Sequence, residues 1–144
     1  MIKVIDATDH ITGRLSSNVA KRLLDDEDLE IAIVNAEKAI ISGNRRMIIE
    51  DFKAKRALNH PRKGPNYPRM PDKILKRTIR GMLPYQKPRG KNALKRVKAY
   101  IGVPPEFKKS KMEKIDGAVK PDIHMYMTLE KISKRLGADY HKEE

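Results

Sequence analysis

The hydrophobic positions at the start of the chain follow two patterns, one typical of strands and one typical of a helix. Residues 2–7, IKVIDA, form a short β-branched run that ends in polar turn formers, which predicts a buried strand. In the segment GRLSSNVAKRLLDD, Leu15, Val19 and Leu23 recur every four positions, which predicts a helix with one apolar stripe. Residues 30–36, EIAIVNA, are almost continuously apolar and predict a second strand. This strand–helix–strand order, with strands apolar on both faces, favours a parallel sheet covered by helices.

Further strands and helices follow from the same patterns, with capping residues at their ends. We expect strands at 38–43 and 97–102, the second of which could complete the sheet. The expected helices are 44–58, capped by Asn44 with Ile48, Ile49 and Phe52 facing inward, and 128–137, from Thr128 as cap to Gly137 as stop, after an irregular stretch at 103–127.

Between residues 58 and 96 the pattern changes, because prolines and cations replace the apolar runs. Residues 58–71 hold four prolines, which predict an extended, partly polyproline-like loop that cannot bury itself. Residues 77–96 hold seven cations and no acid. We expect Asp72 to cap a helix with Leu75, Ile79 and Met82 opposite a basic face, and we expect Gly81, Pro84, Pro88 and Gly90 to break any long helix after it.

The length of 144 residues is typical of one domain with a real core. We therefore expect a single domain, 1–144, whose α/β body comprises 1–57 and 72–102, with a basic proline-rich loop at 58–71. The tail, 103–144, is expected to be irregular apart from its short helix. The chain has no cysteine, no apolar run of the ~18 residues that a membrane span needs, and no signal-peptide pattern. These features predict a cytoplasmic protein without disulfides.

Charge is segregated along the chain. The net charge is +13, but residues 1–42 carry 5 basic and 8 acidic side chains, residues 43–111 carry 21 and 4, and residues 112–144 carry 6 and 7. A nearly neutral frame therefore holds one strongly cationic central segment, and most of its cations have no acidic partner nearby in the sequence. Such an imbalance points to a polyanionic partner outside the protein.

Two acids after the first strand offer the best alternative chemistry. Asp6 and Asp9 follow a strand whose carboxyl end would lie at the ligand-binding edge of an α/β sheet, and paired carboxylates can hold Mg²⁺. No further acid or base is fixed near them in the sequence, so a turn-forming role is the better interpretation. The single glycine of ITGR makes a weak phosphate signal. His10, His60, His124 and His141 lack ligand spacing, and each is interpreted as exposed or hydrogen-bonded.

RNA is the polyanion that fits the central segment best. An irregular basic chain with Tyr67, Tyr85 and Tyr100 can follow folded phosphate paths and stack on bases. A membrane fits less well, because the apolar face of the basic helix is needed for the core and the prolines provide no lipid-seeking face.

Four segments also make the chain similar to a known family. DATDHITGRLSS, IVNAEKAIISGN, RTIRGMLP and ALKRVKAYIGVP occur in the family's order and span about residues 4–104. They resemble the large-subunit ribosomal protein L13 family in its archaeal-type form. The resemblance implies a three-layer α/β/α domain with a small, mainly parallel sheet, bound to large-subunit rRNA, without enzymatic activity or cofactor, and acting early in subunit assembly. It places the RNA-facing positions within residues 44–100 and weakens the case for a metal at Asp6 and Asp9.

These arguments predict a structural rRNA-binding protein with neighbouring large-subunit ribosomal proteins as further partners, and neither a membrane nor a small-molecule substrate. A Mg²⁺-dependent nucleic-acid enzyme using Asp6 and Asp9, or regulatory RNA binding off the ribosome, are the alternatives. We expect Arg→Lys changes at Arg62, Arg69 and Arg89 on the loops to cost on the order of 1 kcal/mol or more, since a planar guanidinium can make paired hydrogen bonds there. On the helix face, Arg77→Lys and Arg80→Lys should be nearly silent by comparison. The predicted RNA-binding residues are Arg14, Arg45, Arg46, Lys53, Arg56, His60, Arg62, Lys63, Arg69, Lys73, Lys76, Arg77, Arg80, Lys87, Arg89, Lys91, Lys95 and Arg96.

Overall fold

A parallel sheet forms the centre of the fold. The computed structural model of the chain describes residues 1–58, 60–64, 66–120 and 122–140, so Pro65 of the predicted loop and His141 lie outside the described residues. Strands β1 (Ile2–Asp6), β2 (Glu30–Val34), β4 (Val97–Ala99) and β5 (Met112–Glu113) are all parallel and lie in the order β4–β2–β1–β5. Strands β3 (Ile40–Ser42) and β6 (Tyr126–Thr128) form a separate antiparallel pair.

Most of the helices lie between these strands in the sequence, and one follows the last strand. The longer ones are α1 (Thr12–Asp25), α2 (Arg45–Ala57), α3 (Pro71–Met82), α4 (Pro88–Lys95) and α5 (Leu129–Arg135), and the short 3-10 helices are η1 (Ala36–Lys38), η2 (Pro105–Phe107) and η3 (Asp116–Ala118).

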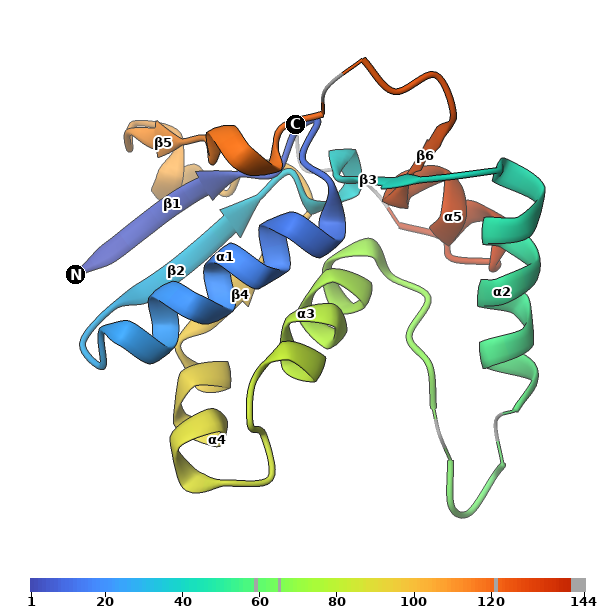
Figure 1. The fold of residues 1–144 in the computed structure, drawn as a ribbon, viewed down its shortest axis with the longest axis horizontal. Helices are drawn as coiled ribbons and strands as arrows, with labels where there is room; N and C mark the ends of the chain where they lie inside the picture. The colour runs from blue at the N-terminus through green and yellow to red at the C-terminus, as the bar shows by residue number, and fades with distance from the viewer. Residues whose placement is uncertain (59, 65, 121, 141–144) are drawn as a thin grey trace.

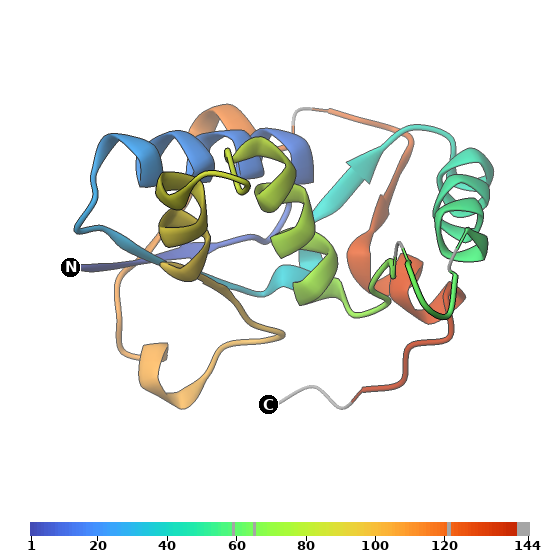
Figure 2. The same ribbon diagram turned by 90° about the horizontal axis from the view of Figure 1, so that it is seen from below.

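Alternate residues of the strands face two different layers, as the two-residue period of a strand requires. Ile5, Ile31 and Ile33 point into the main core, which α1, α3 and α4 cover on one face of the sheet (Figure 1). Val4 and Val34 point the other way, where Tyr100, Val103, Phe107 and Met112 pack against them. Figure 2 shows α1, α3 and α4 on one side of the sheet and the chain around η2 on the other. The α/β class is confirmed, and its second covering layer is an irregular chain with a 3-10 turn rather than long helices.

Most of the expected elements are confirmed, and so are the expected caps of α2 and α5. Asn44 caps α2, since its side chain accepts a hydrogen bond from the Arg46 N–H at 3.0 Å. Thr128 caps α5 in the same way through the Lys131 N–H at 3.4 Å, and Gly137 follows with a positive φ of 87°.

Two expectations about the central and C-terminal segments are wrong, the cap of α3 and the irregular chain after residue 103. Helix α3 begins at Pro71 without a side-chain cap, and Asp72 lies in its first turn instead. No long helix spans residues 77–96, as expected, because α3 ends at Met82 and the eight-residue α4 starts only at Pro88. Gly81 and Gly90 lie within these two helices rather than between them. Proline suits the first position of a helix, because no intrahelical acceptor is available there for an N–H. The segment after 103 adds β5 to the sheet and β6 to β3, so it is less irregular than predicted.

His10 ties the turn before α1 to this C-terminal segment. Its side chain is fully buried, and its Nε2 accepts a hydrogen bond from the Ile115 N–H at 3.0 Å. The proton therefore sits on Nδ1, which lies 3.0 Å from the Thr8 carbonyl oxygen and donates to it. The hydrogen-bonded interpretation of this histidine is confirmed, while His60 and His124 are exposed.

Candidate nucleic-acid interface

The basic elements are neighbours in the fold. In Figure 1, α3 and α4 lie below the sheet, α2 stands at the right-hand side of the body, and the chain that joins α2 to α3 lies at the lower right. These four elements belong to the part of the sequence, residues 43–111, in which 21 basic side chains accompany only 4 acids. These four elements hold 15 of those 21 cations, so the fold brings most of the cationic segment together.

Helix α3 has one apolar and one basic face, as predicted. Ile74, Leu75 and Ile79 are buried against the core. Lys73 and Lys76 lie on the other face, where neither makes an ion pair with any residue that the structure describes. Their charges are therefore available to an external anion.

The two arginines on this face of α3 rest on tyrosine rings. The guanidinium carbon of Arg77 lies 4.8 Å from the centre of the Tyr67 ring, and that of Arg80 lies 4.7 Å from the centre of the Tyr85 ring. Both distances are typical of cation–π contacts. The Arg77 Nη1 also donates to the Asn66 carbonyl oxygen at 3.3 Å. Of the three tyrosines expected near RNA, Tyr100 instead packs against Phe107 on the other face of the sheet.

A groove of about 310 Å³ runs along this basic face. It lies between α3, α4 and the chain that leads into α3. Its lining residues are Asn66, Pro68, Lys73, Lys76, Arg77, Arg80 and Leu94. The groove therefore combines four cations with two apolar side chains, Pro68 and Leu94.

The predicted residues of α2 are mostly exposed, but some are engaged within the protein. Arg45 and Lys53 are exposed, and Arg46 forms an ion pair with Glu50 at 3.1 Å. Arg56 is half-buried and its Nη1 donates to the Tyr67 carbonyl oxygen at 2.6 Å. Burial, and then the nearby charge of Arg69, lower the pKa of Arg56.

The loop between α2 and α3 carries four predicted residues, His60, Arg62, Lys63 and Arg69, all exposed. The Arg62 N–H donates to His60 Nδ1 at 3.3 Å, which helps to hold the turn at its tip. Arg69 and Lys73 also line a hollow of about 510 Å³ beside Arg56, which brings three cations from the loop, α3 and α2 together.

The segment around α4 divides into exposed and internally bonded cations. Lys87, Lys91 and Lys95 are exposed. Arg89 donates through Nη2 to the Leu24 carbonyl oxygen at 2.8 Å. Arg96 is bonded three times within the protein, to the carbonyl oxygens of Asp26 at 2.7 Å, Leu29 at 2.9 Å and Leu23 at 2.8 Å. These contacts give Arg96 a structural role at the end of α1, and Arg14 lies apart from the four basic elements, exposed in the first turn of α1.

Gly90 fixes the turn between α3 and α4. A Cβ atom at this position would lie 2.0 Å from the Pro84 carbonyl oxygen and 2.8 Å from the Tyr85 nitrogen. Only glycine permits this approach of α4 to the backbone of the turn. Because the turn carries Tyr85, the close contact also determines where the ring beneath Arg80 lies.

Asp6 is a turn residue. Its Oδ1 accepts hydrogen bonds from the Thr8 N–H at 3.0 Å, the Thr8 hydroxyl at 2.7 Å and the Asn35 amide at 3.0 Å. Burial raises the pKa of Asp6, but these hydrogen bonds and the charge of Lys114 outweigh it, so the pKa lies below its ordinary value. Asp9 is exposed with a positive φ of 60°. Both acids thus shape the turn after β1.

Neither a metal cluster nor a membrane helix is found in the described part of the chain. Its His, Asp and Glu side chains form no group of three or more that could hold an ion. None of its helices is both long and apolar enough to cross a bilayer.

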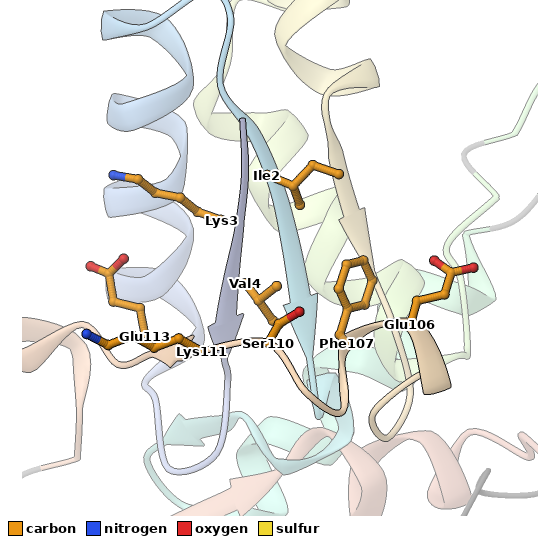
Figure 3. A pocket seen from close by; sticks show the side chains of 8 residues that line it. All are labelled: Ile2, Lys3, Val4, Glu106, Phe107, Ser110, Lys111 and Glu113. Atoms are coloured by element: carbon orange, nitrogen blue, oxygen red, sulfur yellow. The ribbon is translucent and has the colours of Figure 1, made fainter.

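Another hollow, of about 650 Å³, lies away from the basic elements (Figure 3). It borders β1 and the chain from η2 to β5. Its lining residues are Ile2, Lys3, Val4, Glu106, Phe107, Ser110, Lys111 and Glu113. Two lysines and two glutamates balance each other there, so this hollow lacks the cationic excess of the groove beside α3.

The fold and the site define a class of protein: an α/β body that presents a basic surface, with no metal-holding group of acids or histidines among the residues described. The family model described as Ribosomal protein L13 matches residues 1–106. The Large ribosomal subunit protein uL13 of Thermoplasma acidophilum is 49% identical over 136 residues, which cover 94% of this chain and 98% of the relative. The protein of the same name from Methanocaldococcus jannaschii is 49% identical over 141 residues, 95% of this chain and 98% of the relative. That from Archaeoglobus fulgidus is 46% identical over 137 residues, 93% and 86% respectively.

The chain therefore belongs to the ribosomal protein L13 family, and the resemblance seen in residues 4–104 is confirmed. It is a structural ribosomal protein and not an enzyme. The pairwise matches cover more than nine tenths of the chain, so they also include most of the segment after residue 104.

Proposed function

We propose that the surface formed by α2, the 58–70 segment, α3 and α4 binds large-subunit rRNA, and that the protein works there as a structural component. The observation that carries this proposal is the basic face of α3, where Lys73 and Lys76 have no ion pair among the described residues and border a groove with Arg77 and Arg80. Cations left without internal partners gain most from phosphates, because binding releases the counterions condensed on the RNA.

The test is binding to a large-subunit rRNA transcript at several salt concentrations. With roughly six phosphate contacts, affinity falls about a thousandfold between low and moderate salt. The variant Lys73→Ala with Lys76→Ala weakens binding and lowers the salt slope by nearly ~2. A matched control, Lys21→Ala with Lys131→Ala, removes the same charge from exposed positions on α1 and α5. Equal losses in both variants would show that net charge, rather than this face, holds the RNA.

We further propose that the protein joins the RNA early in subunit assembly, as one folded domain whose neighbours are other large-subunit ribosomal proteins. The main core supports this, since Ile5, Leu15, Leu75 and Leu129 are fully buried by the chain itself and come from segments spread over it. A protein that folds by itself presents its basic surface before other components arrive. Pulse-labelled protein should appear in precursor particles before mature subunits, and its first appearance in mature subunits would refute the early role.

A further inference from the structure

Two arginines of α3 are held in a geometry that their charge alone does not require. Arg77 lies over Tyr67 and Arg80 lies over Tyr85, three residues further along the same helix face. A phosphate needs only a nearby cation, which a flexible side chain provides. A guanidinium held against a ring is instead a flat group with a fixed orientation.

The position of the groove shows where these flat groups face. Arg77 and Arg80 both line the groove of about 310 Å³, whereas Tyr67 and Tyr85 do not. Each guanidinium therefore has a tyrosine as support and also borders open space. Pro68 and Leu94 give the same groove apolar surface, and Lys73 and Lys76 give it two further cations.

We propose that this groove binds unpaired nucleotides of the rRNA, with bases stacked on Arg77 and Arg80 and adjoining phosphates at Lys73 and Lys76. The proposal rests on the function proposed above, that the basic face of α3 binds rRNA. Sequence-specific RNA recognition mostly targets unstacked bases, and arginine planes are among the groups on which such bases stack. Because each tyrosine already orients its arginine, less side-chain freedom is lost when the base arrives.

Stacking distinguishes arginine from lysine at these positions, because lysine keeps the charge but has no plane. From the sequence alone, Arg77→Lys and Arg80→Lys are expected to leave RNA affinity nearly unchanged. The stacked geometry now gives the opposite expectation for both. The matched control is Arg135→Lys, a charge-conserving change of the same kind at an exposed position on α5, outside the proposed surface.

The experiment measures the affinity of the full chain for a large-subunit rRNA transcript over a series of salt concentrations. We expect Arg77→Lys with Arg80→Lys to lose about tenfold or more in affinity with an unchanged salt slope, because base stacking contributes and the charge does not change. The control variant should remain within about twofold of the original chain, as charge is conserved. Should the double variant fail to fold by circular dichroism, Arg80→Lys alone and Tyr85→Leu serve instead, since Tyr85 is 37% exposed.

A competition measurement adds a readout that depends on the bases. A short oligoadenylate should displace the rRNA better than an abasic chain of equal phosphate number, and this preference should vanish in Arg77→Lys with Arg80→Lys. Affinity of that variant equal to the original, or equal competition by both oligomers, overturns stacking. If Lys73→Ala with Lys76→Ala still weakens binding in that case, the proposed function stands and only the stacking fails. If none of these variants weakens binding, the proposed function fails as well.

Discussion

Helices α2 and α3 are similar in length and both basic, yet they are held to the protein in different ways. Helix α2 has 13 residues and buries only Ile48 and Phe52, whereas α3 has 12 residues and buries Pro71, Ile74, Leu75 and Ile79. In Figure 1, α3 lies under the sheet and α2 lies at the side, next to α5. The core therefore fixes α3 much more firmly than α2.

Their cations differ as well. On α2, Arg46 pairs with Glu50 at 3.1 Å and Lys55 with Asp51 at 3.0 Å, so the helix compensates part of its own charge. On α3, Lys73 and Lys76 have no ion pair among the described residues, and the arginines rest on tyrosines. The number of cations is similar on the two helices. In the structure, however, only α3 of these two combines firm packing with uncompensated charge. We accordingly expect α3 to be the principal RNA contact and α2 a secondary one.

The largest expected difference concerns the core. Ile79→Ala on α3 should lower the free energy of unfolding by about 3 to 4 kcal/mol, because the side chain is fully buried and its removal leaves a cavity. Ile48→Ala on α2 removes a side chain that is 9% exposed and should cost about 2 kcal/mol. Urea denaturation followed by circular dichroism measures both. Equal costs would show that the two helices are fixed equally firmly.

The second prediction concerns the turn that connects the end of α3 to α4. Gly90→Ala places a methyl group 2.0 Å from the Pro84 carbonyl oxygen and should cost about 2 kcal/mol or more. Gly81→Ala is the control, since nothing lies within 4 Å of its Cβ position inside α3. That change should stabilise the protein by up to about 1 kcal/mol, because alanine favours the helix over glycine. Melting temperatures that change in the same direction for both variants would refute the requirement for glycine at position 90.

A third prediction compares RNA binding by the two helices. Lys76→Ala on α3 should reduce the slope of log affinity against log salt by just under ~1, as expected for one lost phosphate contact. Arg46→Ala on α2 should change the slope much less, because Glu50 already compensates that cation. Filter binding to an rRNA transcript at several salt concentrations gives both slopes. A larger effect of Arg46→Ala would make α2 the principal contact.

The smallest expected effect on stability comes from removing an ion pair within α2. Asp51→Asn removes the ion pair with Lys55, and the loss should be about 0.3 to 0.5 kcal/mol of unfolding free energy at low salt. The loss should disappear at high salt, where exposed charges are screened. A salt-independent loss would mean that Asp51 acts through packing instead.

The sequence predicts the body of the fold well, because its signals are local. The apolar runs of β1 and β2 and the four-residue spacing of Leu15, Val19 and Leu23 directly reflect which faces are buried. The basic face of α3 follows in the same way from the helical period. These elements need no knowledge of distant residues.

The parts that escaped prediction depend on contacts between distant segments. The sequence does not predict helix α4, because a glycine in its first turn indicates a helix break. In the structure Gly90 is required there because the Pro84 carbonyl oxygen leaves no room for a Cβ atom. The contact between Arg77 and Tyr67 joins α3 to the proline-rich loop that precedes it, and no regular spacing in the sequence predicts such a contact. Arg96 looks like any other cation in the sequence, and only the carbonyl oxygens around it separate a structural arginine from one that could contact RNA.

The three hydrogen bonds of Arg96 also bear on the order in which the chain can fold while it is being synthesised. Their acceptors lie 67 to 73 residues earlier in the sequence, at and just beyond the end of α1. At typical synthesis rates of about 5–20 residues per second, Arg96 is synthesised roughly 4 to 15 s after the residues whose carbonyl groups it binds. Strand β4, which begins at the next residue and lies beside β2, is delayed equally. The N-terminal strand–helix–strand unit can therefore form early during synthesis, but it reaches its final hydrogen bonding only after two thirds of the chain exist.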